Sequence, residues 1–153
     1  MGKLTGTKHG DAVNALMKFY QEEADKLEGV GSYFMAAVAL GAALETALLA
    51  YMLVEWDEDN GGELEIPDRV AMDELIEAAK QFDLLNAVEF QEPGKAVSTS
   101  VEDVIQEVQQ MRNNIHPGKA LRKSFDPSSF GAENYRRIHR IYGTVLDNLI
   151  HWL

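Results

Sequence analysis

An almost uncharged segment constrains this chain more than any other feature. The run from Tyr33 to Val54 is 22 residues long and contains one charged residue, Glu45. A helix of that length is long enough to cross a bilayer. We predict a buried core helix instead, because the run is rich in alanine, is followed by acidic residues, and has amphipathic neighbours that need an apolar partner. Gly41 and the surrounding alanines would let neighbouring backbones approach closely. We therefore expect the centre of a helical bundle and no membrane contact.

Helical spacing of apolar residues recurs along the rest of the chain. Residues three and four positions apart predict helices over about 11–28, 67–85 and 101–116, and a last helix that begins between Pro127 and Glu133 and runs to the C-terminus. Gly29 and Gly31 are expected to end the first of these helices. With 153 residues and no repeat, the chain predicts a single domain over 1–153. The fold class is all-α, an antiparallel bundle of about five helices, with residues 1–10 expected to be a mobile N-terminus.

Composition and charge exclude several kinds of site. The chain has no cysteine, which removes thiol catalysis, cysteine-ligated zinc and disulfides. It has no phosphate-binding glycine loop and no metal-binding histidine motif. A net charge of −11 argues against non-specific binding of nucleic acid. We predict no metal, no cofactor and, without an apolar leader, a cytoplasmic location.

The charge is divided unevenly along the sequence. The stretch 55–92 holds 13 acidic residues against two bases, whereas 112–140 holds seven bases against two acidic residues. A local basic site therefore remains open despite the acidic total. The simplest interpretation of the acidic stretch is a solvated face with an acidic loop.

Glu45 needs a cationic partner if the helix that carries it is buried. At 100° per residue along 101–116, Arg112 falls inside the apolar stripe of that helix. We predict an ion pair between Glu45 and Arg112 that joins the second and fourth helices. Two interpretations stay open: the pair only fixes helix register, or the guanidinium also holds an anion. His116, one turn further on, is either a helix-end histidine bonded to the last carbonyls or a proton donor or acceptor beside a bound phosphate.

Two segments carry a family resemblance. The run Arg112-Asn113-Asn114-Ile115-His116-Pro117-Gly118 and the upstream helix segment 43–49 resemble HEPN domains (higher eukaryotes and prokaryotes nucleotide-binding), and the resemblance covers the chain from about Ser32 onward. Many members are metal-independent ribonucleases that act as dimers in toxin–antitoxin or defence systems, and others are inactive dimerisation or ligand-binding modules. Three residues separate Arg112 from His116, fewer than in the nuclease branches. The spacing is similar to that of an uncharacterised branch with an Arg-Asn-x-Ile-His-Pro core.

The resemblance implies a homodimer and assigns roles by position. Arg112 would contact the scissile phosphate, His116 would move the proton, and Asn113 and Glu45 would support them. Lys119, Arg122 and Lys123 could contact phosphate or another anion. Three functions stay open, in this order: a homodimeric interaction or regulatory module, with a partner protein, in a prokaryotic defence or toxin–antitoxin context; a metal-independent endoribonuclease acting on RNA; and a binder of small anionic ligands.

Overall fold

The structure is a computed structural model that describes residues 2–4, 6–60, 64–66, 89–90 and 99–150. These residues form five α-helices: α1 (Gly6–Gly29), α2 (Tyr33–Asn60), α4 (Val101–Asn113), α5 (Pro117–Arg122) and α6 (Ala132–Ile150). A 3-10 helix, η1 (Pro127–Ser129), precedes α6. Four strands of two or three residues pair antiparallel: β1 (Gly2–Leu4) with β2 (Leu64–Ile66), and β3 (Glu89–Phe90) with β4 (Thr99–Ser100). The described chain is therefore all-α, as predicted.

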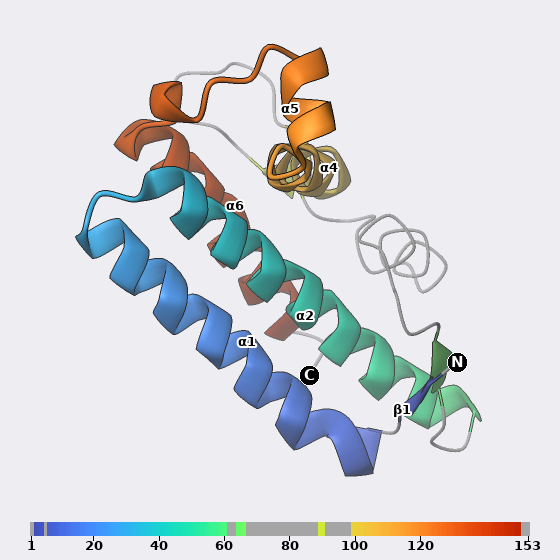
Figure 1. Cartoon of the computed structure of the whole chain (residues 1–153). Coiled ribbons are helices and arrows are strands. Elements are labelled where there is room, and N and C mark those ends of the chain that lie inside the picture. The colour runs from blue at the N-terminus through green and yellow to red at the C-terminus, as the bar shows by residue number, and fades with distance from the viewer. Residues whose placement is uncertain (1, 5, 61–63, 67–88, 91–98, 151–153) are drawn as a thin grey trace.

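The two longest helices form an antiparallel pair, and α6 packs along α2 behind them (Figure 1). The helix α6 runs in the same direction as α2, since Tyr33 and Tyr135 near their starts lie in ring contact. The predicted antiparallel order thus holds for α1 with α2 but not for α2 with α6. A short connection forces antiparallel packing only on consecutive helices, and here α4 and α5 lie between the two in sequence. In Figure 1, α4 is seen nearly end-on and crosses α2.

The core lies where α2 meets its neighbours. Its buried residues come from every long helix, and α2 contributes the most: Val13, Ala24, Ala36, Ala37, Leu40, Ala43, Leu44, Ala47, Leu48, Ile105, Val108, Tyr135, Ile138, Ile141, Tyr142 and Val145. Small alanines allow α1, α4 and α6 to approach the same helix from different sides. By length and composition alone, Tyr33–Ala50 is the one segment in the described chain that could cross a membrane, and half of it is buried inside the protein.

The helix boundaries differ from the predicted ones at several ends. The helix α1 begins at Gly6, five residues before the predicted start, and α2 continues past Val54, where the apolar run ends, to Asn60. The helix α4 begins at Val101, as predicted, but ends at Asn113. The helix predicted over 67–85 lies outside the described residues.

Two helices end in the same backbone motif. After α1, Gly31 has φ of 75°, its N–H bonds to Glu28 O, and the N–H of Ser32 bonds to Leu27 O. These bonds form a Schellman motif, in which a residue of left-handed conformation ends a helix. Gly31 therefore ends α1, as predicted, whereas Gly29 is still helical. The helix α5 ends in the same way at Ser124, a non-glycine residue with φ of 52°.

Candidate functional site

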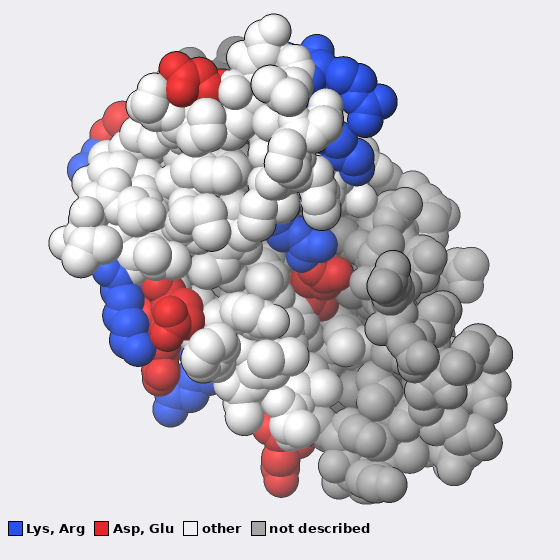
Figure 2. All heavy atoms as spheres, in the orientation of Figure 1, with Lys and Arg blue, Asp and Glu red and all other residues white. Residues whose placement is uncertain are grey.

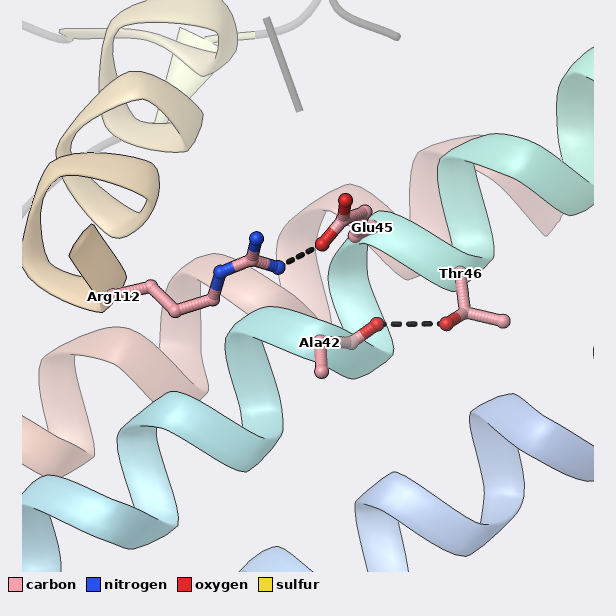
Figure 3. A network of polar contacts seen from close by, with 4 residues as sticks. All are labelled: Ala42, Glu45, Thr46 and Arg112. Atoms are coloured by element: carbon pink, nitrogen blue, oxygen red, sulfur yellow. Dashed lines mark hydrogen bonds and ion pairs between the residues drawn. The ribbon is translucent and has the colours of Figure 1, made fainter. Parts of the chain in front are cut away.

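An ion pair joins α4 to the middle of α2 (Figure 3). Arg112, in the last turn of α4, donates a hydrogen bond from Nη1 to Oε2 of Glu45. The stem of Arg112 lies over Gly41, one turn before Glu45, and a Cβ at Gly41 would lie 3.5 Å from Arg112 Cδ. Because Gly41 carries no side chain, the arginine can cross α2 closely enough to reach the carboxylate. The predicted pair therefore forms, and the predicted close approach occurs at Gly41.

The pair is partly shielded from water. The side chains of Arg112 and Glu45 are 28% and 19% exposed. Burial lowers the pKa of Arg112, and its interaction with Tyr20 acts in the opposite direction. An arginine still keeps its charge at neutral pH after such a change. Arg112 is thus a charged group held between two helices, with its acceptor supplied by the protein.

Packing and a second ion pair fix the direction of Arg112. Val108, one turn earlier on α4, is buried and would lie 3.4 Å from a Cβ at Gly41. On α4 as well, Glu107 pairs with Arg137 of α6 at 2.6 Å. The helix α4 is thus linked to α2 and α6 by apolar and ionic contacts together, which sets where Arg112 leaves it.

His116 lies outside α4, contrary to the prediction that this helix runs to His116. It has extended backbone angles (φ −80°, ψ 118°), because a residue that precedes proline is disfavoured from helical conformation. It is the N-cap of α5, its side chain makes no capping bond, and it is exposed. Its side chain is therefore not the helix C-cap that one interpretation expected. In the part of the chain described here, no hydrogen bond or ion pair joins it to Arg112.

The turn between Arg112 and His116 contains two asparagines. Asn113 is half-buried at the end of α4, and its carbonyl accepts the N–H of His116. The Oδ1 atom of Asn114 is buried and has no hydrogen-bond partner among the described residues. Sequence reasoning assigned Asn113 a supporting role and gave none to Asn114. A buried, unpaired acceptor leaves no mark in a sequence pattern.

Basic side chains gather on α5, as Figure 2 shows. Lys119 and Arg122 lie in its last turn and Lys123 follows as its C-cap. All three are exposed, and Arg122 Nε bonds to the carbonyl of Gly118. These residues follow His116 directly, so the structure keeps the histidine and the predicted anion contacts on one short segment. Among the described residues, no group of three His, Asp or Glu side chains could hold a metal ion.

A pocket outside the predicted site lies between the end of α1 and the first turns of α6. It has a volume of about 280 Å³ and is lined by Glu28, Tyr135, Arg136, His139 and Arg140. Sequence reasoning missed it, since Glu28 and the α6 residues are more than a hundred positions apart. The only sequence signal was the basic stretch 112–140, to which the two arginines belong.

Comparisons of the chain with protein-family models, with curated proteins and with solved structures find no match.

Proposed function

We propose that this protein is a homodimeric interaction or regulatory module, of the HEPN-like kind that the sequence resembles, and that it acts with a partner protein in prokaryotic defence. The observation that carries the proposal is that Arg112 is already bound within its own chain. Its guanidinium is bonded to Glu45 and its stem lies on Gly41. An arginine engaged by its own protein in this way serves to hold α4 on α2.

The exposed surface around α5 supports the same proposal. We define the α5 surface as Ile115, His116, Lys119, Leu121 and Arg122. Ile115 is 47% exposed and Leu121 is 80% exposed, and α5 contains no buried residue. A helix that adds no buried residue to the core of the protein, yet exposes a large apolar side chain among cations, is typical of a contact surface.

Charge complementarity favours a second copy of the chain as the occupant of this surface. The α5 surface is basic, whereas the sequence elsewhere supplies a strongly acidic stretch in every copy. Complementary charge promotes association and suppresses other pairings. A twofold dimer could satisfy both at once, since each copy would offer its α5 surface to the acidic stretch of the other.

Substitution of Leu121 tests the dimer. Leu121→Asp should convert the protein from dimer to monomer in light scattering coupled to gel filtration, because the carboxylate would be buried unpaired at the contact. Val30→Asp is the matched control, since Val30 is 79% exposed but lies in the turn between α1 and α2, away from α5 (Figure 1). The proposal predicts that Val30→Asp remains dimeric. A wild-type monomer, or a dimer unchanged by Leu121→Asp, would contradict it.

A metal-independent ribonuclease is the second candidate, favoured by the exposure of His116 and by the cations that follow it. The RNA 2′-hydroxyl would attack the adjacent phosphorus and displace the 5′-oxygen of the next nucleotide, which leaves a 2′,3′-cyclic phosphate. His116 would pass the proton of the 2′-hydroxyl to the departing 5′-oxygen, and Arg112 would stabilise the charge on the phosphate. This function requires Arg112 to exchange Glu45 for phosphate. Under it, His116→Ala should abolish cleavage of RNA in the presence of chelator while folding is retained. Cleavage that persists in this variant excludes the site.

A further inference from the structure

The pocket between α1 and α6 has walls of opposite charge. Glu28, at the end of α1, forms one wall, and Arg136 and Arg140, one turn apart on α6, form the other. The carbonyl end of α1 adds partial negative charge to the side of Glu28. A ligand in this pocket therefore meets an acidic group on one side and two guanidinium groups on the other.

The charges that face the pocket are not neutralised by one another. In the described part of the chain, Glu28 forms no ion pair with either arginine. Arg136 pairs with Glu133, and both of these side chains are well exposed. Arg140 makes no ion pair with any described residue. One carboxylate and one guanidinium group thus remain available on opposite walls.

Tyr135 supplies a buried polar group to the same pocket. Its side chain is 1% exposed. Burial raises the pKa of Tyr135, and the carboxylates of Glu28 and Asp25 raise it further, so that the hydroxyl stays protonated. The ring of His139 lies 6.1 Å from that of Tyr135. The pocket therefore combines aromatic surface with a protonated phenol hydroxyl close to the carboxylate of Glu28.

We infer that this pocket binds a small zwitterion of amino-acid size. Its ammonium group would pair with Glu28, and its carboxylate would be held by Arg140 with Arg136 beside it. A simple anion would be repelled by Glu28 and a simple cation by the arginines, whereas a zwitterion satisfies both walls. The volume of about 280 Å³ is small for a ligand pocket, which suits a free amino acid. This inference does not depend on the α5 surface or on His116.

Binding of amino acids to the full-length protein tests the inference. Each standard L-amino acid is screened by thermal shift, and those that raise the melting temperature are titrated calorimetrically. We expect at least one to bind, and its N-acetyl and carboxamide forms to bind about tenfold more weakly, a loss of about 1.4 kcal/mol each. If no amino acid binds the wild-type protein, or if a blocked form binds as well as the free one, the inference is wrong.

Variants of the two walls assign the binding to this pocket. Glu28→Gln and Arg140→Gln should each weaken binding about tenfold, and both residues are exposed, so the fold should be retained. Lys18→Gln is the matched control and should bind like the wild-type protein, because Lys18 is exposed on α1 and does not line the pocket. Circular dichroism verifies that each variant is folded. Equal binding by all three variants would place the ligand elsewhere and overturn the assignment.

Discussion

The link between Arg112 and Glu45 makes a quantitative prediction about stability. Removing either charge leaves the other partly buried without its partner. Exposed pairs contribute less than about 1 kcal/mol, whereas breaking a fully buried pair costs about 3–5 kcal/mol. With 28% and 19% of the side chains exposed, the cost should lie between these limits. We expect Arg112→Met, which keeps the stem on Gly41, and Glu45→Gln each to lower the free energy of unfolding by about 2 kcal/mol.

A double-mutant cycle isolates the interaction. In thermal or urea unfolding followed by circular dichroism, each single variant should lower the melting temperature by about 6 °C. The double variant should be more stable than additivity predicts by about 1–2 kcal/mol. The pair Arg136 and Glu133 is a matched control, because its side chains are 62% and 81% exposed, and its coupling should be below about 0.5 kcal/mol. If Arg112 and Glu45 are additive to within the same margin, the pair does not hold α4 on α2.

Four further variants test local features. Ser124→Gly should raise the free energy of unfolding by about 0.5–1 kcal/mol, since glycine adopts the left-handed conformation without penalty; a lower melting temperature would contradict this. Gly41→Ala should cost little, because the added Cβ lies 3.4 Å from Val108 and 3.5 Å from Arg112, whereas Gly41→Leu should cost about 1–3 kcal/mol; equal melting temperatures would refute the close approach. The raised pKa of Tyr135 means that its contribution to stability is complete below the unfolded value of about 10 and is lost at about 1.4 kcal/mol per pH unit above it. Tyr135→Phe should therefore flatten the alkaline loss seen in pH-dependent unfolding, and an unchanged slope would show that this hydroxyl does not titrate with folding.

The sequence was sufficient to predict the centre of the fold. An apolar run with one charge is expected to lie either in a protein core or in a membrane. The amphipathic helices around it favour the protein core, because each of them needs an apolar partner. The same reasoning paired Glu45 with Arg112, because a carboxylate in that helix needs a cation and helical periodicity places the single arginine of α4 on the core side. Both predictions follow from large energetic costs, which is why a pattern can reveal them.

The end of α4 depends on a smaller effect that the prediction misjudged. Pro117 was expected to end the helix at the residue before it. The chain leaves the helix three residues earlier, at Asn113, so that His116 can be extended and Pro117 can begin α5. His116 consequently lies outside α4, so the one-turn spacing from Arg112 that a continuous helix predicts does not apply.

The pocket could not be predicted from the sequence. Its walls come from helices at opposite ends of the chain, and neither Glu28 nor Arg140 differs in pattern from an ordinary solvated residue. Helical periodicity shows which residues face a core but not how two helix ends meet, because the meeting depends on the lengths and directions of all the helices between them.

The short helix α5 is built almost independently of the domain that carries it. None of its residues is buried, and its end is anchored through Phe125, which lies in ring contact with Phe34 of α2. Its outward side chains can thus be exchanged without altering the interior. Substitution of these exposed side chains should therefore change the proposed contact surface while the scaffold stays intact.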